Sequence, residues 1–239
     1  MTGNKFIFDV DGTLTPSRQS IDQEFASWFG QFCQSNHVYL VTGSDYPKTL
    51  EQIGQDLCNS VKRIYNCNGN DVWEKGVNIH SNKWILPLPA HEWLDEQLSQ
   101  SEFPLRTGLH FENRPGMVNF SIVGRNATRK QRAQYVEWDK KTNERDNIAE
   151  WFNKLFPELE ARPGGETGID IGPCGLNKSQ IIKDFDIEDK IYFFGDRQDP
   201  AGNDYPLAEA NKTGRNFHVT GWTQTKEYLQ WLQEMGDAL

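Results

Sequence analysis

The chain has 239 residues, of which 36% are hydrophobic and 12% aromatic, so it can bury one large core or two smaller ones. It carries 34 acidic against 25 basic side chains, which gives a formal charge of -9. This balance excludes the basic surface of a typical nucleic-acid-binding protein, and any bound phosphate must meet a local concentration of positive charge.

The sequence gives no sign of export or of a membrane anchor. Its first residues run straight into the apolar segment Phe6–Val10, which leaves no room for a signal peptide. No apolar stretch approaches the roughly 18 to 20 residues that span a bilayer. The cysteines are scattered without a metal-binding pair, as in a reduced intracellular protein, so a cytoplasmic location is expected. They are Cys33, Cys58, Cys67 and Cys174.

The first 80 residues alternate between short apolar runs and amphipathic segments. Lys5–Val10 is apolar without polar alternation, which is typical of a strand buried on both faces in a parallel sheet. Aromatic spacing predicts a helix over Asp22–Ser35, and a second apolar run, Val38–Val41, follows it. A helix over Pro47–Asn59 and a strand over Arg63–Cys67 complete an order that indicates an open α/β sheet.

The pattern changes after about residue 80. In Met117–Val123 the polar residues Asn119 and Ser121 alternate with apolar ones, which predicts a half-buried antiparallel strand. A charged helix is expected over Thr128–Phe156 and a strand over Thr167–Ile171. These segments predict an α+β module inserted into the first domain.

The α/β order returns in the last part of the chain. The expected elements are a helix over Lys178–Phe185, strands over Ile191–Phe194 and Phe217–Thr220, and a helix over Thr225–Met235. The predicted fold class is therefore α/β, a Rossmann-like core with a parallel sheet plus an inserted α+β domain. We place the core at residues 1–80 and 176–239 and the inserted domain at residues 81–175.

Two aspartates follow the first strand, where the carboxyl ends of parallel strands open onto a crevice. Residues two apart in a strand point the same way, so Asp9 and Asp11 could act on one substrate. A carboxylate can accept a phosphoryl group as an acyl phosphate, while a second acid protonates the leaving oxygen and later deprotonates the attacking one. By itself, such a pair is equally typical of a surface turn.

Polar residues also follow the other predicted strands. Thr42-Gly43-Ser44 offers a hydroxyl and a flexible loop whose backbone N–H groups can bind phosphate oxygens. Lys178, at the start of a helix, can place a positive charge beside a transferred phosphoryl group. Mg²⁺ prefers carboxylate and carbonyl oxygens, which Asp9, Asp196 and the backbone oxygen of Asp11 could supply.

This set resembles the haloacid dehalogenase (HAD) superfamily of phosphotransferases, in which four motifs occur in the same order. The matching segments are Asp9–Thr13, Thr42–Ser44, Lys178 and Gly195–Asp204. The resemblance implies that Asp9 is the nucleophile, Asp11 the general acid and base, and Lys178 a catalytic cation. It also implies a Mg²⁺ ion at Asp9, Asp11 and Asp196.

Longer segments resemble the α-phosphomannomutase family over nearly the whole chain. They are Asp9–Gln19, Glu112–Asn119, Ile122–Arg125, Glu137–Lys141, Tyr192–Asp196 and Pro200–Asp204. In that family the inserted module is a mobile cap of the C2b type. The resemblance implies that the sugar phosphate, as a whole molecule, is held by Ser44 and Arg18 in the core and by Arg114, Arg125, Arg132 and Asp170 in the cap. Guanidinium groups match phosphate bidentately and keep their charge, so several together would offset the net negative charge.

Two positions depart from the family pattern. Gly168 stands where the family usually has serine, so a hydroxyl contact to the substrate is lost or replaced by backbone. Ala210 stands where the family has an aspartate that helps to hold a second cation, which puts a second ion site in doubt.

The resemblance implies a phosphomannomutase-like enzyme that interconverts mannose 6-phosphate and mannose 1-phosphate, with a hexose 1,6-bisphosphate as activator. The same residues would serve a sugar-phosphate phosphatase, in which water attacks phospho-Asp9. A non-catalytic sugar-phosphate binder is a third hypothesis, but it predicts a damaged motif and none is damaged. The sequence does not distinguish mannose from glucose phosphates, and a homodimer through the cap rests on the resemblance alone.

Overall fold

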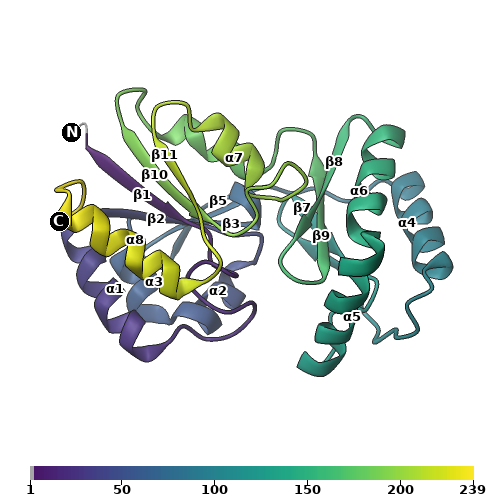
Figure 1. The fold of residues 1–239 in the computed structure, drawn as a ribbon. Coiled ribbons are helices and arrows are strands. Elements are labelled where there is room, and N and C mark those ends of the chain that lie inside the picture. The colour runs from purple at the N-terminus through teal and green to yellow at the C-terminus, as the bar shows by residue number, and fades with distance from the viewer. Residues whose placement is uncertain (1–2) are drawn as a thin grey trace.

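A computed structural model describes residues 3–239 and shows two sheets side by side (Figure 1). The larger sheet has seven strands in the order β11-β10-β1-β2-β3-β4-β5. Their bounds are β1 Asn4–Phe8, β2 His37–Val41, β3 Arg63–Asn66, β4 Asp71–Glu74, β5 Val77–Ser81, β10 Lys190–Gly195 and β11 Arg215–His218. The five strands from β11 to β3 are parallel. At one edge of the sheet, β4 pairs antiparallel with β3, and β5 pairs antiparallel with β4. The predicted parallel core sheet is confirmed.

Aromatic side chains fasten β1 to its neighbour β10. Phe6 stacks on Tyr192 with ring centroids 5.0 Å apart, and Phe8 stacks on Phe194 at 4.8 Å. All four side chains are buried, and each contributes roughly 1.5–3 kcal/mol by leaving water. This packing fixes the ends of β1 and β10 beside each other, and both ends lead into the acidic loops described below.

Helices cover both faces of the seven-stranded sheet. One face packs against α1 (Gln23–Ser35), α3 (Gln55–Ser60) and α8 (Trp222–Glu234). The other face packs against the 3₁₀ helix Lys178–Asp184 and α7 (Tyr205–Ala210). The helix α2 (Tyr46–Ile53) follows β2 and carries Lys48 and Gln52, which are discussed with the candidate site.

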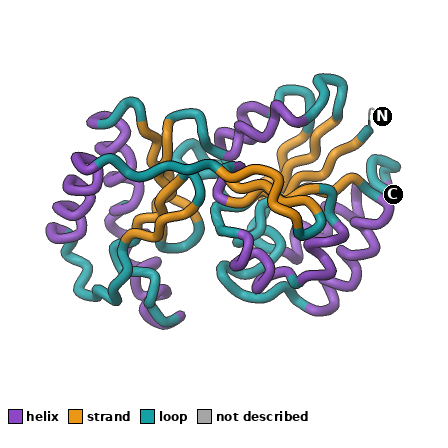
Figure 2. Tube along the Cα trace, turned by 180° about the vertical axis from the view of Figure 1, so that it is seen from behind, coloured by secondary structure: helices purple, strands orange, loops and turns teal. Residues whose placement is uncertain are grey.

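The second sheet has four antiparallel strands in the order β6-β7-β9-β8. Its strands are β6 Phe111–Arg114, β7 Met117–Phe120, β8 Leu159–Gly164 and β9 Gly168–Pro173. The helices α4 (Leu88–Gln100), α5 (Arg129–Thr142) and α6 (Glu144–Leu155) pack on its outer face, and Figure 2 shows them on that side from behind as well. The inner face is turned towards the seven-stranded sheet.

Two predicted helices are each broken in the structure. The helix expected over residues 47–59 is divided into α2 and α3 at Gly54, whose φ of +80° ends the first helix. The helix expected over residues 128–156 is divided at Asn143, which adopts the left-handed conformation with φ +52°. The predicted helix at Lys178 is a 3₁₀ helix, and the strand expected at Phe217–Thr220 is β11, two residues earlier.

The antiparallel strand predicted within Met117–Val123 is confirmed as β7, but the prediction that it is half-buried was wrong. All four residues of β7 are buried, because its polar face is covered by the seven-stranded domain rather than by water. Asn119 on that face donates to the carboxylate of Asp170 at 2.8 Å, and Ser121 just beyond β7 donates to a backbone oxygen. The polar residues therefore mark an interdomain face.

Among the helices of residues 3–239, none is long and apolar enough to cross a membrane.

The cysteines differ in access, and this gives a first prediction. Cys33, Cys58 and Cys67 are buried, and burial raises the pKa of the Cys33 and Cys58 thiols to about 12, whereas Cys174 is exposed. We expect a thiol-specific reagent at pH 8 to label one thiol per native chain quickly and four after denaturation. Cys174→Ser should remove the fast phase, and a second fast thiol in the native protein would contradict the fold.

Candidate active site

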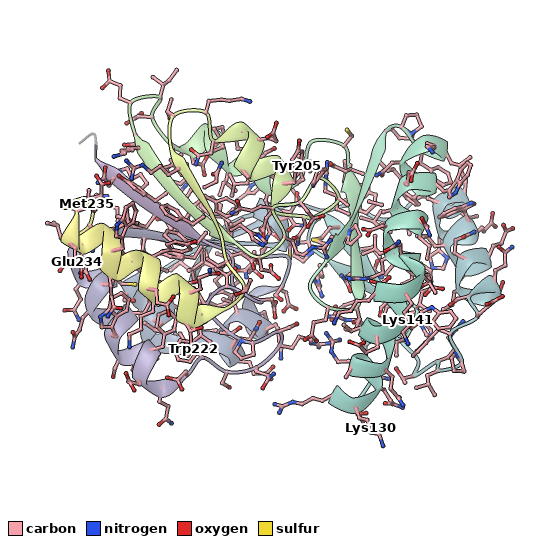
Figure 3. The ribbon with its side chains drawn as sticks, viewed as in Figure 1. Lys130, Lys141, Tyr205, Trp222, Glu234 and Met235 are labelled. Carbon is pink, nitrogen blue, oxygen red and sulfur yellow. The ribbon has the colours of Figure 1, made fainter. Side chains whose placement is uncertain are left out.

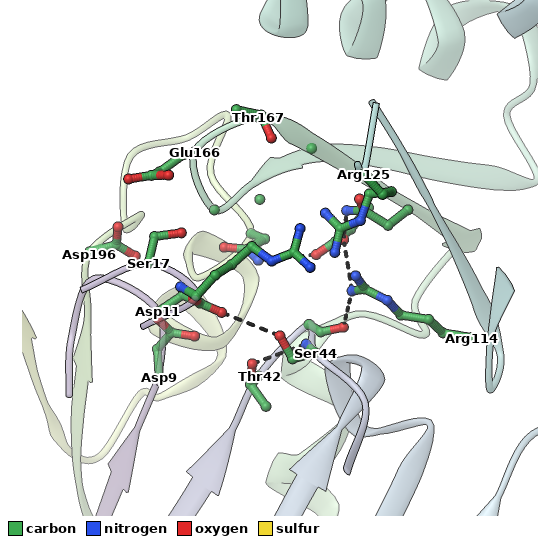
Figure 4. Close-up of a pocket in the computed structure, with 18 of the residues that line it drawn as sticks. Asp9, Asp11, Ser17, Thr42, Ser44, Arg114, Arg125, Glu166, Thr167 and Asp196 are labelled. Atoms are coloured by element: carbon green, nitrogen blue, oxygen red, sulfur yellow. Dashed lines mark hydrogen bonds and ion pairs between the residues drawn. The ribbon is translucent and has the colours of Figure 1, made fainter. Parts of the chain in front are cut away.

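A pocket lies between the carboxyl ends of the core strands and the inner face of the four-stranded sheet (Figure 4). The empty space within it, open solvent included, amounts to about 490 Å³. Nine of the predicted site residues line it: Asp9, Asp11, Arg18, Ser44, Arg114, Arg125, Arg132, Asp170 and Asp196. The tenth, Lys178, lies beneath the floor in contact with Asp9. The structure thus brings all ten together from four separate stretches of the chain.

Asp9 directly follows β1 and is only 4% exposed. Its backbone N–H donates to the carbonyl of Phe194 at 2.9 Å, which holds it at the end of the parallel sheet. The ammonium of Lys178 donates to Oδ1 of Asp9 at 2.6 Å and to Oδ1 of Asp204 at 2.7 Å. Lys178 is fully buried, so this cation is committed to the two carboxylates.

The charge balance around Asp9 is unfavourable without a further cation. Burial, followed by the charges of Asp204 and Asp196, raises the pKa of Asp9 well above its ordinary value, although Lys178 opposes this. Burial and the Asp204 charge raise the pKa of Asp196 to about 7. Burial lowers the pKa of Lys178, but Asp204 and Asp9 outweigh this and hold it above its ordinary value. Three carboxylates therefore lie close together, and the one ammonium among them contacts only Asp9 and Asp204.

A divalent metal ion fits this place. Carboxylate oxygens of Asp9, Asp196 and Asp204 lie within 4.8 Å of one another, and such hard oxygen ligands suit a hard cation. The cluster adds the side chain of Asp204 to the predicted metal set, in which Asp11 was expected to contribute its backbone oxygen. The carboxylate of Asp11 is bound elsewhere, so only its backbone oxygen remains available for the predicted contact.

Gly12 is required for this close approach of two loops. Its φ is +82°, in the left-handed region, and a Cβ atom there would collide with the carboxylate of Asp196. Any larger residue at this position would push the loop of Asp196 away from the end of β1.

The side chain of Asp11 is held by three donors. Its Oδ1 accepts from the backbone N–H of Arg18 at 2.6 Å and from Nε2 of Gln52 at 3.0 Å, and its Oδ2 accepts from the Ser44 hydroxyl at 3.3 Å. The predicted shared direction of Asp9 and Asp11 does not come from the strand pleat, because β1 ends at Phe8. A tight turn instead carries Asp11 over the same pocket.

Arg114 at the end of β6 and Arg125 in the loop between β7 and α5 converge on one carboxylate. Both Arg114 and Arg125 form ion pairs with Oε2 of Glu112, the latter at 2.7 Å. Arg114 also donates to the backbone oxygen of Gly43 in the core. Burial raises the pKa of Glu112, but Arg114 and Arg125 outweigh this and hold it below its ordinary value. Glu112 therefore stays ionised and keeps the two guanidinium groups together.

Arg132 is a lining residue and not a surface arginine. It is 8% exposed, and its guanidinium donates to the Thr167 hydroxyl at 2.9 Å and to Glu166 at 3.1 Å. Burial lowers its pKa, although Glu166 opposes this. These contacts fix the direction of the Arg132 side chain towards the pocket.

Asp170 lies where the two sheets meet. Its Oδ1 accepts from Asn119 at 2.8 Å, and its Oδ2 accepts from Asn203 at 3.3 Å and Asn68 at 3.4 Å. Asn119 belongs to the four-stranded sheet, while Asn68 and Asn203 belong to the core. Beside it, Gly168 leaves room for Asn119, because a Cβ at Gly168 would collide with the Asn119 amide.

The sequence comparison decides the family. The model of the family described as eukaryotic phosphomannomutase matches residues 25–234. The chain belongs to this family. It is 30% identical over 223 residues to the phosphomannomutase of Saccharomyces cerevisiae, a match that covers 87% of this chain and 85% of that one. It is 31% identical over 245 residues to a probable phosphomannomutase of Caenorhabditis elegans, with 94% and 93% covered.

Solved structures agree on the fold of this phosphomannomutase-family chain. It superposes on a trehalose-6-phosphate phosphatase related protein with a TM-score of 0.56 and 19% identity, over 97% of this chain and 98% of the other. At this identity the likeness concerns the fold alone, and it agrees with the predicted α/β core that carries an inserted α+β domain. The family assignment makes the chain an enzyme of the isomerase type.

Sequence reasoning missed three residues of the site. Asp204 lies within a recognised motif, but no role was assigned to it. Glu112 stands two positions before Arg114 on β6, and this i, i+2 spacing of opposite charges on one strand face was an available signal. Gln52 is a fully buried polar residue on α2, and nothing in its spacing pointed to Asp11.

Glu112→Gln gives a second prediction. Glutamine cannot neutralise two buried guanidinium groups, so Arg114 and Arg125 should separate and bind phosphate less well. We expect the KM for a hexose monophosphate to rise about tenfold with a smaller change in kcat, since Glu112 contacts no reacting atom.

Glu150→Gln is the control, because Glu150 pairs with Lys154 on α6 and neither residue lines the pocket. Its KM should stay near that of the unmodified protein. A lower KM in Glu112→Gln would instead mean that Glu112 competes with phosphate for the arginines.

Proposed function

We propose that this chain is a Mg²⁺-dependent mutase that interconverts mannose 6-phosphate and mannose 1-phosphate through a phosphorylated Asp9. The observation that carries this proposal is the pairing of two surfaces across one pocket. The core side of the pocket, which we call the floor, presents the buried carboxylate of Asp9 beside Lys178. The cap side, which we call the roof, presents Arg114, Arg125 and Arg132. A sugar with two phosphate positions would fit such a pocket, with one end at the floor and one at the roof.

In the first half-reaction, the Asp9 carboxylate attacks the phosphorus of a hexose 1,6-bisphosphate. An oxygen–phosphorus bond forms to Asp9, and the bond to the sugar oxygen breaks. Asp11 donates its proton to that leaving oxygen. Mg²⁺ held by the Asp9, Asp196 and Asp204 cluster would neutralise charge on the phosphoryl oxygens.

In the second half-reaction, a monophosphate presents its free hydroxyl to phospho-Asp9. Asp11 removes the proton of this hydroxyl, the new sugar oxygen–phosphorus bond forms, and Asp9 is released as a carboxylate. The donors to Asp11 from Ser44 and Gln52 would keep its carboxyl group aimed at the reacting oxygen in both steps. Lys178 keeps Asp9 oriented throughout.

Water must be kept from phospho-Asp9, because water would turn the mutase into a phosphatase. Contacts between roof and core support this role for the cap (residues 81–175). Arg114 reaches the backbone of Gly43, and Arg162 reaches that of Pro200 at 2.8 Å. In addition, Asp170 of the cap accepts hydrogen bonds from the side-chain amides of Asn68 and Asn203 in the core. These contacts bring the cap over the core side of the pocket, where the arginines would hold the remote phosphate of the sugar.

Three further parts of the proposal rest on the family. We propose that a hexose 1,6-bisphosphate activates the enzyme, that the cap forms a homodimer, and that the protein acts in the cytoplasm. The phosphomannomutase relatives support the proposed activator. In an isomerisation by phosphoryl exchange, Asp9 must already carry a phosphoryl group before it can pass one to a hexose monophosphate.

The test is a product balance. The Mg²⁺-loaded protein is given mannose 1-phosphate with catalytic glucose 1,6-bisphosphate, and mannose 6-phosphate and free phosphate are both measured over time. The proposal expects mannose 6-phosphate to be the main product, with little phosphate released. Release of phosphate without formation of mannose 6-phosphate would show that the enzyme is a phosphatase and not a mutase. A parallel reaction with glucose 1-phosphate measures the sugar preference.

A further inference from the structure

A second hollow opens outside the pocket, between the core and the start of α5. The empty space within it, open solvent included, amounts to about 1080 Å³. It shares Ser17, Arg18, Arg125, Arg132 and Glu166 with the inner pocket, so the two adjoin. We call this outer space the vestibule. Any ligand that enters from this side passes through it before it reaches Asp9.

The vestibule is basic although the whole chain is acidic. Five of its twelve lining residues are cations and two are anions, against a formal charge of -9 for the chain. Both anions already have partners, because Glu166 pairs with Arg132 at 3.1 Å and Glu137 pairs with Lys140 at 2.9 Å. Three of the five cations are paired as well: Arg132 with Glu166, Arg125 with Glu112 and Lys48 with Glu51. Among residues 3–239, the cations of the vestibule without an ion-pair partner are therefore Arg18 and Arg129.

Two of these cations extend the basic surface beyond the predicted site. Arg129, the first residue of α5, is exposed, and Lys48 on α2 lines the opposite wall with a side chain 17% exposed. Within residues 3–239, no ion pair or side-chain hydrogen bond engages the guanidinium of Arg129 or that of Arg18. Lys48 pairs with Glu51 at 2.9 Å, on the rim.

We propose that the vestibule is an outer anion subsite for phosphate monoesters, in which Arg129 and Lys48 meet a phosphate group before it moves to the inner arginines. This deepens the proposed function and rests on it for the identity of the ligand. A net charge of -9 repels a dianionic sugar phosphate, and a basic entrance reverses that repulsion along one path. Unpaired guanidinium groups can bind phosphate without first breaking an internal ion pair.

The test compares two charge reversals at neighbouring positions. Arg129→Glu and Lys130→Glu change the net charge equally, and both residues are exposed at the start of α5, where Figure 3 marks Lys130. Arg129 lines the vestibule, whereas Lys130 lines a different surface depression. All proteins carry Asp9→Asn, so that neither isomerisation nor hydrolysis consumes the ligand. Binding of mannose 1-phosphate is measured by calorimetry with Mg²⁺ present.

We expect Arg129→Glu to weaken binding about tenfold at ~20 mM NaCl and about threefold at ~300 mM, because salt screens the charge. Lys130→Glu should weaken it less than about threefold at low salt and hardly at all at high salt. Lys48→Gln should change binding in the same direction as Arg129→Glu. If Arg129→Glu and Lys130→Glu weaken the affinity for mannose 1-phosphate equally at both salt concentrations, the proposed subsite is wrong.

The binding test of the vestibule and the product test of the mutase can fail independently of each other. The binding measurement does not depend on whether phospho-Asp9 gives its group to sugar or to water. If the product balance identifies a phosphatase while Arg129→Glu still weakens binding selectively, the subsite stands and the mutase does not. Thermal melting of each variant checks that the comparison concerns folded protein.

Discussion

Replacing Asp9 with asparagine should reduce kcat by at least about 10⁴-fold, the largest effect expected of any single substitution in this chain. Asparagine has nearly the same shape but cannot accept a phosphoryl group as a stable acyl phosphate. No neighbour can take over, because Asp196 and Asp204 are engaged in the acidic cluster and Asp11 is held by its own donors. Initial rates of mannose 6-phosphate formation measure the loss.

The fold itself should tolerate Asp9→Asn. Burial raises the pKa of Asp9, so its ionised form costs stability at pH values above its ordinary pKa, and this cost disappears with asparagine. In metal-free buffer at pH 7 the free energy of unfolding should be unchanged or higher. Asp56→Asn on the exposed start of α3 is the matched control and should keep full activity. Activity above about 1% in Asp9→Asn would remove Asp9 from the nucleophile role.

Lys178→Met should have the second-largest effect and should act on both stability and turnover. Its ammonium is the shared partner of the buried carboxylates of Asp9 and Asp204, at 2.6 and 2.7 Å. Removing one partner of a buried ion pair typically costs about 3–5 kcal/mol, since the remaining charges are left uncompensated. We expect a loss of this size in urea unfolding without metal, and about 10³-fold lower kcat with Mg²⁺.

A double variant separates these two effects. Adding Asp204→Asn to Lys178→Met removes one uncompensated carboxylate, so part of the lost stability should return while turnover stays low. If Lys178→Met unfolds at the same urea concentration as the unmodified chain, the buried Lys178–Asp9–Asp204 contact does not exist in solution.

The strand ends could be predicted from sequence because their signal is local. An apolar run followed by polar residues places Asp9, Ser44 and Asp196 at one edge of a parallel sheet without knowledge of any distant contact. The sheet order and the pocket agree with that expectation. The cap arginines came from the family resemblance, since an arginine alone is usually a surface residue.

The remaining parts depend on contacts between distant residues. Gln52 binds Asp11 from 41 positions away, and Asp204 binds Lys178 from 26. Likewise, the burial of Asn119 depends on how the four-stranded sheet faces the core, which the strand's own alternation does not encode. The helix break at Asn143 depends on a left-handed conformation that asparagine adopts in some contexts and not in others.

The most direct test of the central claim follows the phosphoryl group itself. The Mg²⁺-loaded protein is incubated with glucose 1,6-bisphosphate carrying ³²P, separated from free ligand, and chased with either mannose 1-phosphate or buffer. The account predicts hydroxylamine-sensitive label on Asp9 that passes rapidly to mannose 1-phosphate and leaves slowly as phosphate in buffer. Label on another residue, or equal loss to water in both chases, would contradict it.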